Sequence, residues 1–149
     1  MIRKATLQDL DQLTNLFDQY VVFYKKPSDY EKHREYLKER MENNEATIFI
    51  ASDDANPDKI IGFALIYVTF SSLALNKILI LNDLFVDASI RKKGIGEKLI
   101  LKTVEFAKEL GSNVIRLRTA KSNTVAQGLY NKMGFVREDY LYSYDLTVN

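Results

Sequence analysis

The fold of this chain is decided by the stretch Leu81-Asn82-Asp83-Leu84-Phe85-Val86 and by Arg91-Lys92-Lys93-Gly94-Ile95-Gly96-Glu97 after it. The first stretch is typical of a buried strand, and the second is a basic loop with two glycines that opens a helix. The free N–H groups at such a helix start and the helix dipole both favour an anion. Since Gly94 and Gly96 carry no Cβ, phosphate oxygens can approach the backbone there. The sequence therefore predicts a phosphate-binding turn, with a solvated basic turn that only caps a helix as the alternative.

Two common phosphate-binding loops do not fit this turn. A P-loop needs Gly-Lys followed by Ser or Thr, whereas Gly96 is followed by Glu97. A dinucleotide-binding fingerprint needs a third glycine or alanine, and Leu99 stands at that position. That fingerprint also belongs to a first βα unit, while this turn follows three expected antiparallel strands. The turn is therefore expected to be a different kind of anion site.

The first part of the chain predicts a short strand and two helices. The strand is expected at Ile2 to Ala5. Thr6 with Asp9 three residues on resembles a capping box, with Asp in place of Glu, so a helix is expected to begin there. Ser28 and Glu31 make a second capping box and predict a helix that ends near residues 43–44.

A sheet is expected from the middle of the chain. Apolar runs at residues 47–52, 59–70 and 75–86 are joined by short turns, which predicts an antiparallel meander. A helix from Gly94 to Gly111 and a strand at 114–119 follow. A strand, a crossover helix and a second strand predict a parallel pair with a right-handed connection.

The last part of the chain predicts one more helix and a final strand or hairpin. The helix runs from about Thr124 to Met133, and Gly134 ends it. Residues 136–146 carry three tyrosines on one face of the expected strand, and these tyrosines fit strand packing, a dimer contact or the lining of an acceptor site. The whole order predicts one mixed α+β domain that spans residues 1–149.

Composition and charge exclude several classes of function. The 21 basic residues nearly balance the 20 acidic ones, which argues against a general nucleic-acid binder. The chain has no cysteine and one histidine, so a metal site is not expected, and His33 fits a boundary position on the second helix. The apolar stretch from Ile60 to Phe70 is too short to span a bilayer, and the first residues do not form a signal peptide. We therefore expect a cytoplasmic protein with no membrane partner.

Two motifs resemble those of the GNAT superfamily of N-acetyltransferases. The pattern Arg-x-x-Gly-x-Gly after a strand that ends in Leu-Phe-Val resembles motif A, and residues 123–135 are similar to motif B. The resemblance implies an α+β (mixed α/β) fold with a mixed, largely antiparallel sheet of six to seven strands, flanked by four helices. It also implies acetyl-CoA as co-substrate. Residues 16–24, Ser71-Ser72 and 81–86 are similar to the histone/polyamine-acetyltransferase-like (HPA-type) branch.

The resemblance also implies which residues contact the cofactor. The turn would bind the pyrophosphate, Phe85 and Val86 would lie along the pantetheine arm, and backbone N–H near Phe85 would polarise the thioester carbonyl. Asn123 would hydrogen-bond the cofactor, and Tyr130 would protonate the departing thiolate. The full set of implied cofactor contacts is Leu84, Phe85, Val86, Arg91, Lys92, Lys93, Gly94, Ile95, Gly96, Asn123, Ala126 and Tyr130.

The acceptor side of the site is less closely defined. The incoming amine must lose a proton, and Asp83 or a water chain can accept it. Related polyamine acetyltransferases often have Glu where this chain has Asn82, which cannot act as a base. Strand alternation is expected to put Asn82 and Asp83 on opposite faces, and either face can hold the substrate. In GNAT folds the segment between the first two helices walls the acceptor site, so Tyr20, Tyr24 and Tyr30 are candidates there.

These expectations lead to one main hypothesis and two alternatives. The chain is expected to transfer acetyl directly to a primary amine, either of a polyamine-like or amino-acid-like small molecule or of a peptide lysine. The alternatives are a non-catalytic module that senses CoA and an interaction domain that lost the cofactor site. Asp83 and Tyr130 can also be purely structural residues. The oligomeric state is left open, with a homodimer through the tyrosine-rich last strand as one option.

Overall fold

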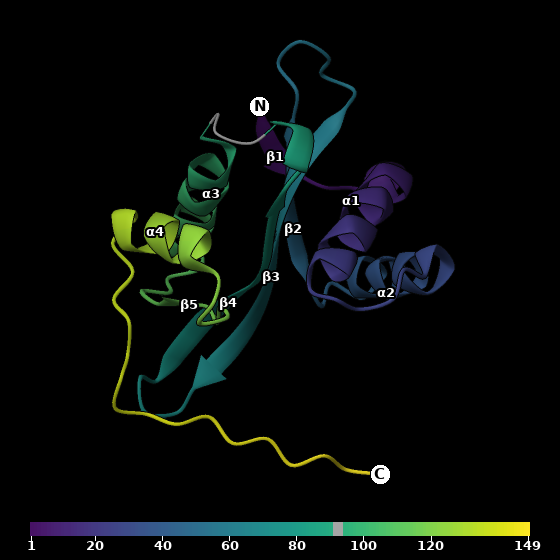
Figure 1. Ribbon diagram of the computed structural model, residues 1–149. Coiled ribbons are helices and arrows are strands. Elements are labelled where there is room, and N and C mark those ends of the chain that lie inside the picture. The colour runs from purple at the N-terminus through teal and green to yellow at the C-terminus, as the bar shows by residue number, and fades with distance from the viewer. Residues whose placement is uncertain (91–93) are drawn as a thin grey trace. The chain divides into compact units, whose positions relative to one another are not determined.

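The computed structural model describes residues 1–90 and 94–149, which form two compact units, 1–118 and 119–149 (Figure 1). Arg91, Lys92 and Lys93 lie outside the described residues. The described residues form four α-helices and a mostly antiparallel sheet, as the predicted α+β class requires. That residues 1–149 make a single domain stays a prediction.

The first unit is built on a five-stranded sheet in the order β1-β2-β3-β4-β5. Its strands are β1 (Ile2–Lys4), β2 (Thr47–Ser52), β3 (Ile60–Ser71), β4 (Asn76–Val86) and β5 (Ile115–Arg116). The first four strands pair antiparallel, and β4 pairs parallel with β5. The predicted meander is thus confirmed, whereas the predicted count of six to seven strands is wrong for the described residues.

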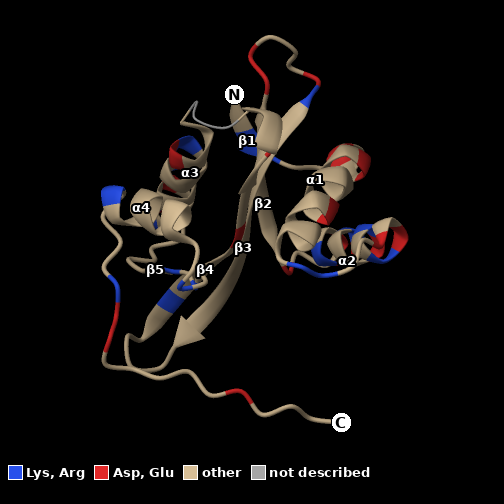
Figure 2. Ribbon diagram, in the orientation of Figure 1, with Lys and Arg blue, Asp and Glu red and all other residues tan. Residues whose placement is uncertain are grey.

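Helices cover both faces of this sheet (Figure 1). On one face lie α1 (Leu10–Phe23) and α2 (Tyr30–Glu42), and their apolar residues form the core with strand residues such as Phe63 and Leu65. On the other face lies α3 (Ile95–Glu109), where the ring of Phe106 meets that of Phe49 on β2 at 5.6 Å. Residues 60–66 of β3, in the middle of the sheet, are therefore buried on both sides. The outer surface of α2 carries mixed charges (Figure 2).

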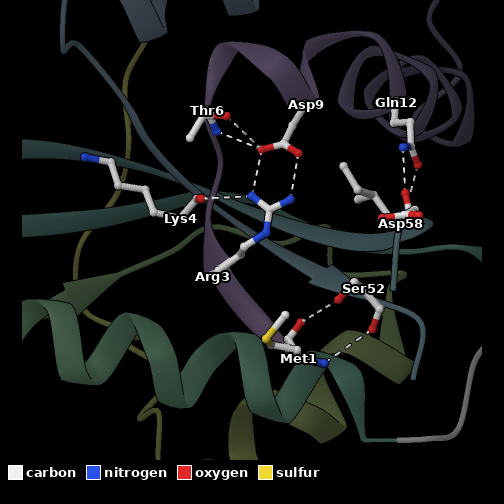
Figure 3. Close-up of polar contacts among 9 residues, drawn as sticks. Met1, Arg3, Lys4, Thr6, Asp9, Gln12, Ser52 and Asp58 are labelled. Carbon is white, nitrogen blue, oxygen red and sulfur yellow. Dashed lines mark hydrogen bonds and ion pairs between the residues drawn. The ribbon is translucent and has the colours of Figure 1, made fainter. Parts of the chain in front are cut away.

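The entry into α1 is fixed by the predicted capping box (Figure 3). A 3-10 turn, Leu7–Asp9, precedes the helix, and the Thr6 backbone N–H donates to the Asp9 carboxylate at 2.8 Å. Arg3 on β1 donates to both oxygens of Asp9, each at 2.8 Å. This bidentate pair lowers the pKa of Asp9, and it ties the first strand to the first helix.

The start of α2 depends on a contact with α1. The carboxylate of Asp18 accepts hydrogen bonds from the Ser28 hydroxyl at 2.5 Å and from the Asp29 N–H at 3.0 Å. The Nδ1 of His33 lies 2.7 Å from the same carboxylate. Because Ser28 is used in this way, the cap of α2 is Asp29, which accepts from the N–H of Lys32.

The second unit contains α4 (Thr124–Lys132), which ends near Gly134 as predicted. Within residues 134–149, all of which are described, no strand forms. The predicted strand or hairpin over 136–146 is therefore wrong, because a strand needs a hydrogen-bonded neighbour and this segment has none among the described residues. Its tyrosines, Tyr140, Tyr142 and Tyr144, are more than four-fifths exposed.

Candidate active site

The sheet opens at the end of β4. Leu79 and Ile80 pair with Ile115 and Arg116 of β5, and β5 ends there. Of the following residues, Leu81, Asp83, Leu84, Phe85 and Val86 pair with β3. Among the described residues, no strand pairs with the other edge of this part of β4.

A β-bulge lies at the start of this open edge. Leu65 pairs with Asp83 but its neighbour Ile66 pairs with Leu81, so Asn82 is an extra residue in β4. A bulge interrupts the regular alternation of side chains. The Asn82 amide consequently donates a hydrogen bond to Asp83 Oδ1 at 3.2 Å. The prediction that these two side chains lie on opposite faces is therefore wrong.

Asp83 is a buried carboxylate with protein donors around it. It is only 6% exposed, and this burial raises the pKa of its carboxyl above the ordinary value. Hydrogen bonds from Tyr20 and Asn82 act in the opposite direction: they stabilise the charged carboxylate and so lower the pKa of Asp83. Such a group combines a perturbed pKa with a fixed position, which is what a proton acceptor in a reaction requires.

An aromatic wall joins α1 to β4 beside this carboxylate. The ring of Tyr20 meets that of Phe85 at 6.0 Å and that of Phe63 at 6.0 Å, both edge-on. Tyr24 continues the wall, with its ring 4.9 Å from Tyr20. The fold thus brings four of the predicted residues together from two distant segments: Tyr20, Tyr24, Asp83 and Phe85.

Tyr30 lies in a different environment from the other predicted tyrosines. Its hydroxyl is 3.4 Å from the carboxylate of Asp11 on α1. Asp11 also accepts from Arg34 at 2.8 Å. Tyr30 therefore belongs to an exposed polar contact between α1 and α2.

Three residues beside Asp83 were missed by sequence reasoning: Tyr67, Tyr36 and Arg40. Tyr67 lies on β3 two residues beyond Leu65, the partner of Asp83, and its hydroxyl is 2.5 Å from that of Tyr36 on α2. Burial, the bond to Tyr36 and the charge of Asp83 together raise the pKa of Tyr67 above its ordinary range. Two patterns in the sequence point to these residues. Residues 63, 65 and 67 alternate along the expected strand and so share one face, and Tyr36 and Arg40 are spaced i,i+4 on the expected helix and so are neighbours on its surface.

The predicted phosphate turn leads directly into α3. Gly94 precedes the helix with φ 72° and ψ 17°, a left-handed conformation that favours glycine. Among the described residues, a Cβ at this position would be in ordinary contact with the Glu97 carboxylate, at 3.8 Å, and with no other group within 4 Å. The N–H groups of the first helical turn, from Ile95 onward, lie at the positive end of the helix.

β3, β4 and the start of α3 approach closely at Gly62. Gly62 pairs with Val86, and a Cβ added to it would lie 3.1 Å from the carbonyl oxygen of Phe85. The same Cβ would lie 3.3 Å from the side chain of Ile95. The end of β4 and the start of α3 therefore occupy fixed positions relative to each other.

The second unit holds the other predicted cofactor residues. Asn123 is the N-cap of α4, and its side-chain oxygen accepts from the N–H of Ala126 at 3.2 Å. The ring of Tyr130 meets that of Phe135 at 5.7 Å. This capping gives Asn123 a local structural role in addition to the role that the family resemblance implies.

Two further properties hold for the described part of the chain. Residues 1–90 and 94–149 contain no group of three His, Cys, Asp or Glu side chains that is suited to a metal ion. Their helices are also too short or too polar to cross a membrane.

Comparisons with known proteins agree with this geometry. Residues 10–135 match the Acetyltransferase (GNAT) family. An uncharacterized N-acetyltransferase of Bacillus subtilis, YhfO, is 37% identical over 147 residues, covering 99% of this chain and 97% of that protein. The crystal structure of a probable acetyltransferase has a TM-score of 0.93 at 34% identity, covering 100% of this chain and 98% of that one. The D-amino-acid N-acetyltransferase HPA3 of Saccharomyces cerevisiae is 34% identical over 89 residues, 60% of this chain and 55% of that protein.

Proposed function

This chain belongs to the GNAT family of acetyltransferases and is an N-acetyltransferase, and we propose that it transfers acetyl from acetyl-CoA directly to a primary amine. The acceptor is a small molecule, polyamine-like or amino-acid-like, or a peptide lysine. The observation that carries the proposal is the buried carboxylate of Asp83 beside the open edge of β4.

The residues present fit acetyl-CoA at two places. The edge of β4 at residues 84–86, with which β5 does not pair, supports a pantetheine arm that lies along the strand. The start of α3, where Gly94 has a left-handed conformation, supports a pyrophosphate held by backbone N–H groups. The same site would include Gly96 and the basic residues 91–93, and the family resemblance adds Asn123, Ala126 and Tyr130.

Three groups of the protein would act during the reaction: a proton acceptor, a donor that stabilises negative charge, and a proton donor. Bound acetyl-CoA supplies the activated acetyl group as a thioester. Asp83 receives the proton that the acceptor ammonium loses, which leaves the amine lone pair free to form the new N–C bond. Backbone N–H near Phe85 would stabilise the negative charge on the thioester oxygen, and Tyr130 would give its proton to the sulfur as the C–S bond breaks. The second proton that the nitrogen loses as the amide forms would restore the Tyr130 hydroxyl.

A non-catalytic CoA-binding module is the second candidate. It is favoured by the low exposure of Asp83, whose carboxylate is already hydrogen-bonded by Tyr20 and Asn82. A sensor needs the open edge of β4 and the start of α3 but has no use for a proton acceptor. The two candidates therefore differ in product formation and agree in cofactor binding.

The deciding experiment measures binding and product separately. Titration calorimetry with acetyl-CoA should show binding, and mass spectrometry should show an acetylated product with at least one member of a panel of diamines, amino acids and lysine peptides. Binding without any product would support the sensor. If acetyl-CoA does not bind at high micromolar concentration, both candidates fail.

A further inference from the structure

The acceptor side of the proposed site contains a hydrogen-bonded chain of side chains from Arg40 through Tyr36 to Tyr67. The Arg40 guanidinium lies over the Tyr36 ring, 4.7 Å from its centroid, and a hydrogen bond with the Tyr36 side chain raises the pKa of Arg40. The two hydroxyls of Tyr36 and Tyr67 are 2.5 Å apart. Three residues from α2 and β3 are thus connected beside the carboxylate of Asp83.

Arg40 restricts the hydrogen bonds of this chain. A guanidinium has donors and no acceptor, so the Tyr36 hydroxyl accepts from Arg40. Between the Tyr36 and Tyr67 hydroxyls either oxygen can be the donor, and among the described residues Tyr36 is the one hydrogen-bond partner of the Tyr67 hydroxyl. When Tyr36 is the donor, the Tyr67 proton points away from Tyr36 and can be given to a ligand.

Neighbouring residues hold both Arg40 and Tyr36 in place. Its guanidinium pairs with Glu39 at 3.1 Å and with Glu45 at 3.2 Å, and its side chain is 19% exposed. The Tyr36 ring is stacked on Phe17 of α1, with centroids 6.5 Å apart and an interplanar angle of 11°. Neither member of the chain can turn without losing these contacts.

The position of Tyr67 relative to Asp83 defines what can bind between them. Asp83 pairs with Leu65 across the sheet, and Tyr67 lies two residues further along β3, a step of about 7 Å. The site therefore offers an acceptor for an ammonium group at Asp83 and a hydroxyl at Tyr67, whose backbone position is about 7 Å further along the strand. An amine with a carboxylate at its other end matches both groups, and an extended basic amino acid has about this length.

We propose that Tyr67, oriented by Tyr36 and Arg40, binds the carboxylate of an amino-acid acceptor whose side-chain amine lies at Asp83. This inference rests on the proposed function, because it names the substrate class of the same site. Tyr67 is then a specificity-determining residue. A diamine of the same length has a second ammonium in place of the carboxylate. An ammonium cannot accept a hydrogen bond from the Tyr67 hydroxyl, so the diamine lacks this interaction.

The test uses three acceptors of matched length: L-lysine, lysine amide and 1,5-diaminopentane. The kcat/KM of the wild type should be about tenfold or more higher for lysine than for the diamine, as expected for a hydrogen bond to a charged group. Lysine amide, which keeps a carbonyl without the charge, should fall between them. Equal values for lysine and the diamine overturn the proposal.

Variants separate Tyr67 from a general structural effect. Tyr67→Phe should lower kcat/KM for lysine by about tenfold and change the value for the diamine by less than about twofold. Tyr36→Phe breaks the chain before Tyr67 and should have a smaller effect of the same kind. Tyr30→Phe removes a hydroxyl that contacts Asp11 and should change neither value. An equal loss for both acceptors in Tyr67→Phe overturns the proposal.

A binding measurement makes the outcome independent of catalysis. Calorimetry of lysine and of the diamine with the CoA-bound protein should show tighter binding of lysine in the wild type and no preference in Tyr67→Phe. If no amine gives product but this preference is found, the proposed reaction fails and the inference stands. If neither amine binds, or both bind equally, the inference fails even where other amines are acetylated.

Discussion

The side-chain amide of Asn82 donates a 3.2 Å hydrogen bond to the carboxylate of Asp83, its neighbour on β4. Adjacent residues of a regular strand do not meet in this way, because their side chains point to opposite faces. The bulge between Leu81 and Asp83 makes the contact possible. The bulge in β4 thus brings a hydrogen-bond donor to the candidate proton acceptor.

The first prediction concerns Asp83 as proton acceptor. In Asp83→Asn, kcat should fall about 100-fold or more, the usual effect of losing a general base, while the affinity for acetyl-CoA stays nearly unchanged. In the wild type, the rate should rise with pH as Asp83 ionises. Steady-state kinetics from pH 4 to 8 measure both effects. Asp54→Asn, which changes an exposed carboxylate, serves as control, and equal rates in the two variants would assign Asp83 a structural role.

The stability of the same variant provides a second check on Asp83. Because its pKa is raised in the folded protein, the unfolded chain releases the proton first as pH increases from the ordinary value of 3.8. Stability due to this group is therefore present at low pH and lost as pH rises through the raised pKa. Chemical denaturation should show the wild type losing stability relative to Asp83→Asn over this window. A pH-independent difference would contradict the raised pKa.

The second prediction concerns the turn before α3. Gly94→Ala forces an alanine into a left-handed conformation at a cost of about 1–2 kcal/mol, and it should weaken acetyl-CoA binding because the helix start shifts. Gly128→Ala, which changes a glycine inside α4 with open space around it, should stabilise the protein by about 1 kcal/mol and leave binding unchanged. Calorimetry and thermal melts measure the pair. Unchanged affinity in Gly94→Ala would place the pyrophosphate elsewhere.

The third prediction concerns Tyr130 as the acid. Tyr130→Phe keeps the ring contact with Phe135 and removes the hydroxyl, so turnover should fall by about tenfold or more with little change in acetyl-CoA affinity. Kinetics and calorimetry with acetyl-CoA provide the measurement, and Tyr140→Phe, at an exposed position, is the control. A parallel loss of turnover and of affinity would identify a structural tyrosine.

The fourth prediction concerns self-association. Residues 136–148 carry seven large apolar side chains that are at least 69% exposed, which is the composition of a segment that pairs with another chain. We expect a homodimer in solution and a monomer in the double variant Tyr142→Ser, Tyr144→Ser. Light scattering after gel filtration gives the mass. Val125→Ser, which changes an exposed residue of α4, should stay dimeric, and a monomeric wild type would contradict the prediction.

The parts of the fold that depend on local chemistry were predictable from the sequence. The capping box of Thr6 and Asp9 forms as expected, because both partners lie within four residues. The turn at the start of α3 was predictable from Gly94 and Gly96, and Gly94 has the left-handed conformation that favours glycine. The meander followed from short turns between apolar runs.

The parts that depend on distant partners were not predictable. The sequence predicts Ser28 as the N-cap of α2, but the N-cap is Asp29, because the Ser28 hydroxyl donates to Asp18, ten residues earlier in the chain. The strand expected at 114–119 is shortened to Ile115–Arg116, since only Leu79 and Ile80 of β4 pair with it. The bulge at Asn82 likewise depends on the register with β3. The Tyr36–Tyr67 contact joins residues 31 positions apart, and no local signal reports such a pair.

The missing side chain at Gly62 has a consequence for what the enzyme can accept as an acyl donor. A single methyl group there would displace the Phe85 carbonyl or Ile95 by a few tenths of an ångström, because both lie within 3.3 Å of its position. The strand that would hold the reacting end of the donor and the helix that would hold its diphosphate end would then move apart. Under the proposed function, the absence of a side chain at residue 62 therefore keeps the two proposed anchors of acetyl-CoA at a set spacing.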